Sequence, residues 1–426
     1  MSQTPSLANR NTLCIIMGGG RGKRMEPLTR YRSKPAVPLG GNYRLIDIPI
    51  SNCLNSGFNK ILVLTQYNSE SLNKHIFRTY KLDTFFGGFV EILAAEQSYE
   101  KTEWFQGTAD SVRRAMPHIH DPKIDEVIVL SGDQLFNMDL RDLQREHHRR
   151  GADITVACHP EPEENISGFG VMNVDHDSRI TSFIEKPKDP ALVSGAKILV
   201  EGKPRYLASM GIYIFKKDVL TELLRQNPDQ TDFGKEIIPL AIRNRKVHAY
   251  NFDDYWSDIG TIGSYYEASL MLTDYTPAFN LYNEDWQIFT RPRYLPPAKI
   301  LECQIHQSII SEGCIIEESV IRRSLIGVRS VIGNNTRIFE SIVTGNDLFE
   351  SVADRAAKTD RGVPALGIGR DCEIRKAIID KNVSIGDGVK IINKNGAENE
   401  DGEKYSIRDG IVVIHKGAVI PSGTVI

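Results

Sequence analysis

The sequence lacks paired cysteines, long apolar runs and signal-like termini. Its six cysteines, among 426 residues, form no C-x-x-C pair and no zinc-ligand spacing, so we expect reduced, mostly buried thiols rather than a disulfide framework. No stretch approaches the roughly 18 apolar residues of a membrane-spanning helix. The polar residues 1–11 contain no apolar core of a signal peptide and indicate no transit peptide. These absences predict a cytoplasmic protein that has no membrane partner.

A large excess of charge is also missing. The chain has 52 basic and 55 acidic residues, which give a net charge of −3. This balance argues against nucleic acid as a partner and requires any positive potential to be local. With 41% hydrophobic and 25% charged residues, the composition is that of a folded globular protein. The length favours two domains over one.

A glycine-rich loop near the N-terminus is the first candidate site. The apolar run Ile15–Met17 is followed by four glycines within five positions, three cations ending at Arg24, and Lys34 ten residues later beside proline. Glycine lets backbone N–H groups approach an anion closely, and nearby cations strengthen its binding. We interpret the loop as a phosphate site, with a plain structural turn as the alternative.

The common phosphate motifs do not fit this loop. A Walker pattern with its second glycine at Gly22 would need glycine at Met17 and Ser or Thr at Arg24. A dinucleotide pattern that starts at Gly18 would need glycine at Lys23. Both are therefore excluded.

Residues 12 to about 280 alternate between apolar runs typical of buried strands and longer amphipathic stretches typical of helices. The clearest examples are the predicted strands 61–64, 127–130 and 154–157 and the predicted helices 109–116 and 140–150. This alternation predicts an α/β domain, in which ligands bind beyond the carboxyl ends of the strands.

Two aspartates follow predicted strands or turns in this domain. Asp133 comes directly after the run 127–130, and Asp258 lies in a Trp-Ser-Asp-Ile-Gly tract. A carboxylate among phosphate-binding cations is misplaced unless it holds a metal, and Mg²⁺ commonly uses one or two protein carboxylates. Helix capping or simple surface exposure is the alternative for each.

Other polar residues follow the same logic. Glu185 and Lys186 end a predicted strand before proline, Gly170 permits close backbone approach, and Ser209 is the one hydroxyl in a buried strand. The tract 104–110 combines aromatic rings, an amide and a Gly-Thr turn, which suits an adenine or sugar pocket as well as a core edge. A solvated ion pair is the alternative for Glu185 and Lys186.

The chain changes character after a proline-rich stretch. Beyond it, aliphatic residues recur at intervals of five or six: Ile310, Ile316, Ile321, Ile326, Ile332, Ile338 and Val343, then Ile368, Ile374, Ile379, Ile385 and Ile391, then Ile414, Ile420 and Ile426. This spacing predicts a parallel β-helix, with polar insertions at 347–363 and 393–405 that loop out. Because some acyltransferases use such helices with a catalytic histidine, His306 and His415 are rival candidates. We interpret both as surface residues.

Taken in order, these motifs resemble the ADP-glucose pyrophosphorylase family, the glucose-1-phosphate adenylyltransferases, from about residue 12 to the C-terminus. The matching motifs are the glycine loop, Lys34–Pro38, Arg44–Asp47, Leu64–Gln66, Trp104–Asp110, Gly132–Asp133, Glu185–Pro187, Ser209–Gly211 and Trp256–Thr261. The resemblance implies an N-terminal tail (1–11), a Rossmann-like, GT-A-like nucleotidyltransferase domain with a mixed sheet (12–285), a linker (286–300) and a left-handed parallel β-helix domain (301–426).

The resemblance also implies roles. In the family reaction a glucose 1-phosphate oxygen attacks the α-phosphorus of ATP, and pyrophosphate leaves. The implied catalytic residues are Arg24, Lys34 and Asp133, and Mg²⁺ would be held by Asp133 and Asp258. The implied nucleotide-side residues are Gln66, Trp104, Phe105, Gln106 and Gly107. The implied glucose 1-phosphate residues are Gly170, Glu185, Lys186 and Ser209.

Regulation and assembly are implied in the same way. The resemblance points to a homotetramer that anions such as 3-phosphoglycerate and phosphate regulate. The implied effector-binding residues are Arg32, Arg44, Lys60, Lys74, Asp380, Lys381 and Lys416. The lysine linked to fructose 1,6-bisphosphate control in some enteric members falls on Tyr31, which argues against that effector. A regulatory subunit with little activity is the alternative, and a preference for UTP or dTTP would indicate a different sugar nucleotidyltransferase.

Overall fold

The computed structural model describes residues 11–82, 87–95, 104–119 and 121–426. The expected N-terminal tail therefore lies outside the described residues, apart from Asn11. The chain forms two compact units. The first unit contains the described residues up to Gly20, Ile48–Trp256 and Asp285–Phe289, and the second contains Arg21–Asp47, Ser257–Glu284 and Thr290–Ile426.

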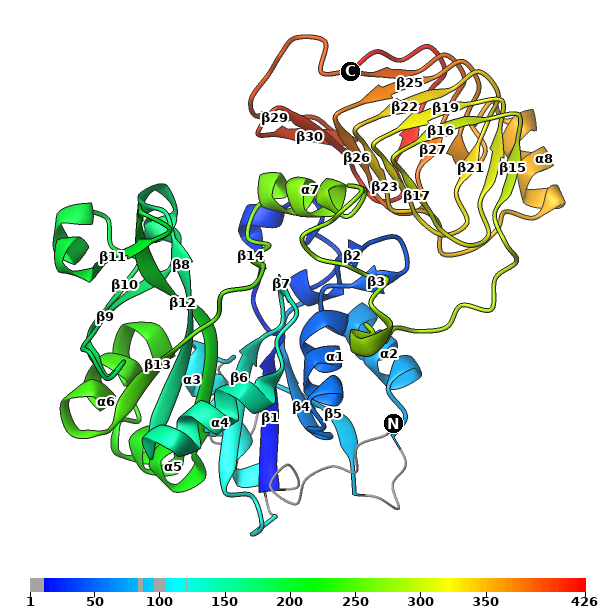
Figure 1. Cartoon of the computed structure of the whole chain (residues 1–426). Helices are drawn as coiled ribbons and strands as arrows, with labels where there is room; N and C mark the ends of the chain where they lie inside the picture. The colour runs from blue at the N-terminus through cyan, green and yellow to red at the C-terminus, as the bar shows by residue number, and fades with distance from the viewer. Residues whose placement is uncertain (1–10, 83–86, 96–103, 120) are drawn as a thin grey trace. The chain divides into compact units, whose positions relative to one another are not determined.

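A mixed ten-stranded sheet organises the first unit (Figure 1). Its main path runs β10-β9-β12-β6-β1-β4-β5, with β11 and β8 also on β12 and β13 on β8. The strands are β1 (Thr12–Met17), β4 (Lys60–Thr65), β5 (Phe89–Ala94), β6 (Glu126–Ser131), β8 (Ile154–Glu161), β9 (Gly170–Val174), β10 (Ile180–Glu185), β11 (Lys197–Val200), β12 (Lys203–Lys216) and β13 (Val247–Asn251). The predicted strands 61–64, 127–130 and 154–157 are confirmed.

Helices pack on this sheet. They are α1 (Asp47–Asn55), α2 (Glu70–Thr79), α3 (Thr108–Ala115), α4 (Leu140–Arg150), α5 (Lys217–Gln226) and α6 (Ile238–Asn244). Helix α3 contacts β1 and β4, and α4 contacts β8, β12 and β13. Strand β1 pairs in parallel with both β4 and β6, so its apolar run is covered on all sides. Strand β12 runs antiparallel to β6 and β8, which makes the sheet mixed.

Three parallel sheets form the β-helix of the second unit (Figure 1). The first contains β15 (Lys299–Leu301), β18 (Ile315–Glu317), β21 (Val331–Ile332), β24 (Gly367–Ile368), β27 (Ser384–Ile385) and β32 (Val419–Ile420). The second contains β16 (Gln304–His306), β19 (Val320–Arg322), β22 (Arg337–Phe339), β25 (Glu373–Arg375) and β28 (Lys390–Ile391). The third contains β17 (Ile309–Ile310), β20 (Leu325–Ile326), β23 (Ile342–Val343), β26 (Ala377–Ile379) and β31 (Ile411–Ile414).

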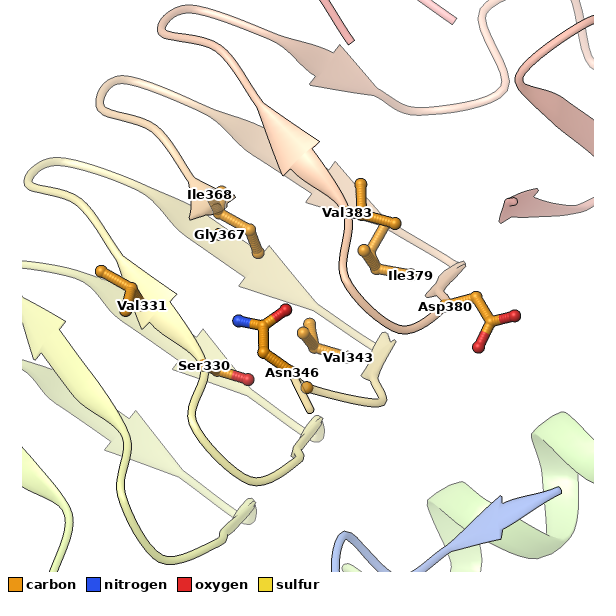
Figure 2. Close-up of a pocket in the computed structure, with 10 residues that line it drawn as sticks. Ser330, Val331, Val343, Asn346, Gly367, Ile368, Ile379, Asp380 and Val383 are labelled. Atoms are coloured by element: carbon orange, nitrogen blue, oxygen red, sulfur yellow. The ribbon is translucent and has the colours of Figure 1, made fainter. Parts of the chain in front are cut away.

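The predicted aliphatic repeat forms ladders inside these coils. In the second sheet Ile321 pairs with Ile338, which pairs with Ile374, which pairs with Ile391. All four are fully buried. Each buried isoleucine contributes roughly 1.5–3 kcal/mol of apolar transfer energy, so stacked coils share one continuous core. One small cavity between coils has a volume of about 10 Å³ and is lined by Val343, Ile368 and Ile379 among others. Figure 2 shows these residues.

The two predicted insertions leave the coils. The segment 347–363 contains an exposed helix, α8 (Val352–Asp360). The segment 393–405 leads through β29 (Glu400–Asp401) into β30 (Tyr405–Arg408), which pairs antiparallel with β31. Here one expectation was wrong: His415 is buried, and its Nε2 atom lies 2.9 Å from the Ser406 hydroxyl. The hairpin covers it, so only His306 is the exposed residue that we expected.

Segments far from the β-helix in sequence pack in the same unit. The segment 21–47 contains β2 (Pro38–Leu39) and β3 (Tyr43–Arg44), and 257–284 contains α7 (Ile262–Met271). Two consecutive tyrosines of α7 link these pieces. The Tyr265 hydroxyl donates to the Pro38 carbonyl at 2.8 Å, and the Tyr266 hydroxyl donates to the Glu340 carbonyl at 2.6 Å.

Two predictions from absences can be compared with this fold. Five of the six cysteines are buried and Cys303 is partly exposed, and all six are free thiols, as expected. Among the described residues, no helix has the length and apolar character needed to cross a membrane.

Candidate active site

The glycine loop leaves the carboxyl end of β1 and runs along the end of β4. The Gly18 N–H donates to the Leu64 carbonyl at 2.8 Å, and a Cβ on Gly18 would lie 3.0 Å from that oxygen. A Cβ on Gly19 would lie 3.3 Å from the Cβ of Gln66. Glycine suits these two positions, because a side chain would be tightly packed against the end of β4. The loop and Gln66, predicted separately, therefore lie together.

Asp133 lies beside the same strand end. The Gly132 N–H donates to the Met17 carbonyl at 3.1 Å, which fastens the end of β6 to the end of β1. The Ser131 hydroxyl donates to the Asp133 carboxylate and orients it. Asp133 thus occupies the carboxyl edge of the sheet, where α/β folds bind ligands.

The cationic part of the loop belongs to the second unit and is built around a left-handed glycine. Gly22 has φ of 61°, and a Cβ there would lie 3.0 Å from Thr29 and 3.1 Å from Lys34. The Thr29 hydroxyl donates to the Gly22 carbonyl at 2.9 Å. Lys34 begins a short 3₁₀ turn and is only 8% exposed, so packing fixes its stem.

Arg24, Lys34 and Asp258 gather around this turn. The Lys34 Nζ atom lies 3.6 Å from Asp258 Oδ1. A Cβ on Gly260 would lie 2.8 Å from Asp258 Oδ2 and 3.2 Å from Arg24 Nη2, so both groups lie close to Gly260. Arg24, Lys34 and Asp258 were all candidate site residues in the sequence, and the structure places them close together.

In the first unit, Glu185 is enclosed by two glycines. It ends β10 opposite Gly170 of β9. A Cβ on Gly170 would lie 2.7 Å from Glu185 Oε2, and one on Gly234 would lie 2.6 Å from the same atom. Burial raises the pKa of Glu185, the Lys186 charge opposes this shift, and Asp232 adds to it. Such a carboxylate can accept hydrogen bonds from sugar hydroxyls in a confined space.

Lys186 and Ser209 both lie at irregular backbone, and Lys186 also neighbours the Glu185 carboxylate. Lys186 has φ of 50°, and its Nζ atom lies 3.5 Å from Glu185 Oε1. Ser209 lies where the register of β12 against β8 shifts, next to Gly211 with φ of 68°. Bulges of this kind re-aim side chains next to active sites. The Ser209 hydroxyl accepts from the Gly211 N–H at 3.2 Å.

Sequence reasoning missed Asp232 and Gly234. Both belong to a turn around the π-helix Phe233–Ile237, where the Asp232 side chain accepts from the Lys235 N–H at 2.9 Å. Single π turns often mark functional sites. An Asp-Phe-Gly tract between two helices was the available signal, but nothing local connects it to Glu185.

The aromatic tract before α3 is largely open to solvent. Trp104 is 52% exposed, and its carbonyl accepts from the Gln106 amide at 2.8 Å. The ring of Phe105 lies 5.9 Å from the Arg114 guanidinium. Gly107 approaches the Thr231 carbonyl so closely that a Cβ would lie 2.3 Å from its oxygen. Exposed aromatic and amide groups just before a helix suit a nucleobase.

Comparison with known families agrees with this geometry. Residues 13–275 match the family described as nucleotidyl transferase. The chain belongs to the nucleotidyl transferase family. Residues 293–425 match the GLGC left-handed parallel β-helix domain. A nucleotidyl transferase domain followed by this β-helix is the signature architecture of ADP-glucose pyrophosphorylases.

Asp133 and Asp258 are the two acids that we expect to hold Mg²⁺. Asp133 and Asp258 belong to different units, and a Mg²⁺ site that uses both stays a prediction. Within the described residues, no group of three or more His, Cys, Asp or Glu side chains is arranged to hold a metal. A site with one or two carboxylates, completed by substrate oxygens and water, is a smaller arrangement.

The second unit also contains a group of buried or partly buried cations, which we call the cationic cluster. Its members are Arg32, Arg44, Arg293 and Lys381. Arg32 Nη1 and Asp380 Oδ1 lie 2.9 Å apart, with their side chains 5% and 3% exposed. Figure 2 shows the Asp380 carboxylate directed away from the interior cavity of the β-helix. Burial, together with the neighbouring Arg293, lowers the pKa of Arg44 to about 10. Burial also lowers the pKa of Lys381 to about 8.

Asp347 is the acid that faces these cations from the insertion. Its Oδ1 atom lies 3.5 Å from the Lys381 Nζ atom. Burial raises the pKa of Asp347, but Lys381, Asn382 and Lys416 outweigh this and hold it below the usual value. The predicted residues Arg32, Arg44, Asp380, Lys381 and Lys416 thus belong to one unit.

The other two predicted effector residues lie in the first unit. The Lys60 Nζ atom lies 2.6 Å from Asp121 Oδ2, and the Lys74 Nζ atom lies 2.5 Å from Glu70 Oε1 in an exposed pair. Each thus has a carboxylate partner in its own unit. Their role in effector binding stays a prediction.

Proposed function

We propose that this chain transfers the adenylyl group of ATP to α-D-glucose 1-phosphate, giving ADP-glucose and pyrophosphate for glycogen or starch synthesis. The observation that carries the proposal is the setting of Glu185. A half-buried carboxylate packed against two glycines, with the Lys186 ammonium 3.5 Å away, suits a sugar hydroxyl and a sugar phosphate side by side. The family match supplies the reaction class, and the GLGC domain favours this substrate pair over other sugar nucleotides.

The residues divide the work by their chemistry. Arg24 and Lys34 are cations on fixed backbone, so they would neutralise the ATP phosphates and align the α-phosphorus for in-line attack. Glu185 and Lys186 would hold glucose 1-phosphate by its ring hydroxyls and its phosphate. Adenylyl transfer needs alignment and charge neutralisation more than a covalent nucleophile.

The nucleotide base has its own candidates. Gln66 lies against the glycine loop, and the tract from Trp104 through Phe105 and Gln106 to Gly107 offers rings and amides for the adenine.

Asp133 and Asp258 are the proposed Mg²⁺ ligands. Their carboxylate oxygens are the donor type that Mg²⁺ prefers, and the Ser131 hydroxyl orients Asp133. Mg²⁺, when bound, supplies positive charge to the reacting phosphates. The Lys34 Nζ atom lies 3.6 Å from Asp258 Oδ1, so a cation already neighbours this carboxylate.

The cationic cluster is the proposed effector site, for anions such as 3-phosphoglycerate and phosphate. Arg32 Nη2 and Arg293 Nε are buried and have no hydrogen-bond partner among the described residues. Buried donors without partners are costly, so an anion that accepts from them would be bound firmly. The proposed homotetramer rests on the family resemblance alone, and the proposed cytoplasmic location rests on the cysteine pattern and the polar residues 1–11.

Substitution of Lys186 tests the proposed substrate. We expect Lys186→Gln to raise the KM for glucose 1-phosphate by about tenfold or more while the KM for ATP changes little, because one charge-assisted phosphate contact is lost. Lys188→Gln is the matched control, since Lys188 is an exposed lysine two positions along. An unchanged KM for glucose 1-phosphate would overturn the assignment. No turnover by the unaltered chain would instead favour a regulatory subunit.

A further inference from the structure

The start of α3 is capped by a distant segment of the same unit. The first amides of a helix have no partner within the helix. Here the Ala109 and Asp110 N–H groups both donate to the Thr231 carbonyl, at 2.8 and 3.2 Å. The close approach of Gly107 to the same oxygen requires glycine, because any Cβ would collide with it. The Thr231 backbone therefore completes the helix that follows the Trp104–Gln106 tract.

The contact is reciprocal. The Phe233 N–H donates to the Thr108 hydroxyl at 3.0 Å. The Glu236 carboxylate accepts from the Thr231 and Asp232 N–H groups, at 2.6 and 3.0 Å. Each segment thus supplies hydrogen-bond acceptors for the other segment or for its own turn. We call this arrangement of Gly107, Thr108, Thr231, Phe233 and Glu236 the Thr231 junction.

Arg113, one turn into α3, extends the junction. Its Nε atom donates to the Leu224 carbonyl at 3.0 Å, and its Nη2 atom donates to the Asn227 carbonyl at 3.0 Å and to the Gln230 carbonyl. Its Nη1 atom lies 3.2 Å from Asp110 Oδ1. A half-buried guanidinium with this many acceptors holds the whole 224–230 loop in place, because charge-assisted hydrogen bonds are strong and directional.

Both ends of the junction reach a proposed substrate subsite. On one side the Gln106 N–H donates to Asp110 Oδ2 at 3.0 Å, which orders the nucleotide-side tract. On the other side Gly234 lies directly against the Glu185 carboxylate. A shift of the 231–236 turn by a few tenths of an ångström would therefore move the backbone that packs against the Glu185 carboxylate.

We propose that Arg113 and Thr108 are positioning residues that tie the nucleotide-side tract to the proposed sugar subsite at Glu185. Ordering of the tract by a nucleotide then strengthens glucose 1-phosphate binding, and the reverse holds equally because coupling free energies are reciprocal. This inference rests on the proposed function. Arg113 and Thr108 can have this positioning role without contacting a substrate.

The test measures binding as well as turnover. Glucose 1-phosphate affinity is measured by calorimetry with and without a non-hydrolysable ATP analogue, and the ratio of the two dissociation constants is the coupling factor. The variants are Thr108→Val, which removes the acceptor for the Phe233 N–H, and Arg113→Lys, which removes the branched donor set. Thr221→Val is the matched control, since the Thr221 hydroxyl donates to a carbonyl within its own exposed helix turn. Thr108→Ser should restore the wild-type values.

We expect both variants to reduce the coupling factor by about fivefold or more and to raise the KM for glucose 1-phosphate, with kcat at saturation much less affected. A coupling factor equal to that of the Thr221→Val control in both variants would overturn the inference. A wild-type chain that forms no ADP-glucose from ATP and glucose 1-phosphate would overturn the proposed function instead. If Thr108→Val fails to fold, Arg113→Lys carries the same measurement.

Discussion

Lys381 should destabilise the protein in the absence of anions. Its side chain is 10% exposed, and its ammonium lies 3.5 Å from one Asp347 oxygen. Burial is the main cause that lowers its pKa from 10.5 to about 8, Asp347 opposes the shift, and Arg293, Arg44 and Arg32 add to it. The lowering of the pKa from 10.5 to about 8, at roughly 1.36 kcal/mol per pH unit, means that the charged form costs the folded state about 3 kcal/mol.

The sign follows from linkage. The folded-state pKa lies below the unfolded-state value, so the cost is fully present below pH 8 and disappears as the pH rises from about 8 to about 10.5. Lys381→Met keeps the apolar stem and removes the charge. We therefore expect it to raise the free energy of unfolding by about 1–3 kcal/mol at pH 7 in low salt. The lower value of this range allows for the stability lost when Asp347 no longer has the Lys381 charge as its partner.

The assay is chemical denaturation of the whole chain at pH 7, 8 and 9, at constant ionic strength, with and without sulfate. Sulfate is the probe because its charge does not change over this range. Sulfate should stabilise the wild type most at pH 7 and progressively less above pH 8, and it should stabilise Lys381→Met much less. Lys381→Arg is the control that should keep its response to sulfate through pH 9, because an arginine stays charged there.

Two results would refute this reasoning. One is a Lys381→Met variant that is less stable than the wild type at pH 7 without sulfate. The other is equal stabilisation of both proteins by sulfate.

Three further predictions concern single contacts. Asp133→Asn should lower kcat by about 100-fold or more in a pyrophosphate-release assay and leave the circular dichroism spectrum unchanged; near-normal turnover would refute a metal role. Asp380→Ala should lower the free energy of unfolding by about 3–5 kcal/mol, because it leaves the Arg32 charge buried, whereas replacing both residues by apolar ones of similar size should cost much less in the same denaturation assay. Gly260→Ala should lower kcat/KM for ATP by about tenfold or more in steady-state kinetics, because the added methyl would lie 2.8 Å from an Asp258 oxygen; wild-type kinetics would show that the site can relax.

The β-helix could be predicted from sequence because its order is local and repeated. Each coil buries one aliphatic residue in each sheet, so the same spacing appears coil after coil, and residues such as Ile321 and Ile338 are found in register. The strands of the first unit were predictable for a related reason, since a fully buried strand leaves an uninterrupted apolar run. The glycine loop was also predictable as a distinct feature, because four glycines within five positions stand out in the sequence.

Long-range pairings could not be predicted in this way. Arg32 and Asp380 are 348 positions apart, and no local pattern signals that their side chains meet. Asp232 and Gly234 could not be predicted as site residues, because they come close to Glu185 only once the turn has folded. His415 was misread as exposed because its burial depends on the β30 hairpin, which the sequence pattern presented as a polar insertion.

The most direct test of the central claim is the nucleotide preference of the purified chain in a pyrophosphate-release assay with glucose 1-phosphate. The account predicts that kcat/KM for ATP exceeds those for UTP and dTTP by at least about tenfold, and that release depends on glucose 1-phosphate. Equal or faster turnover with UTP or dTTP would contradict it.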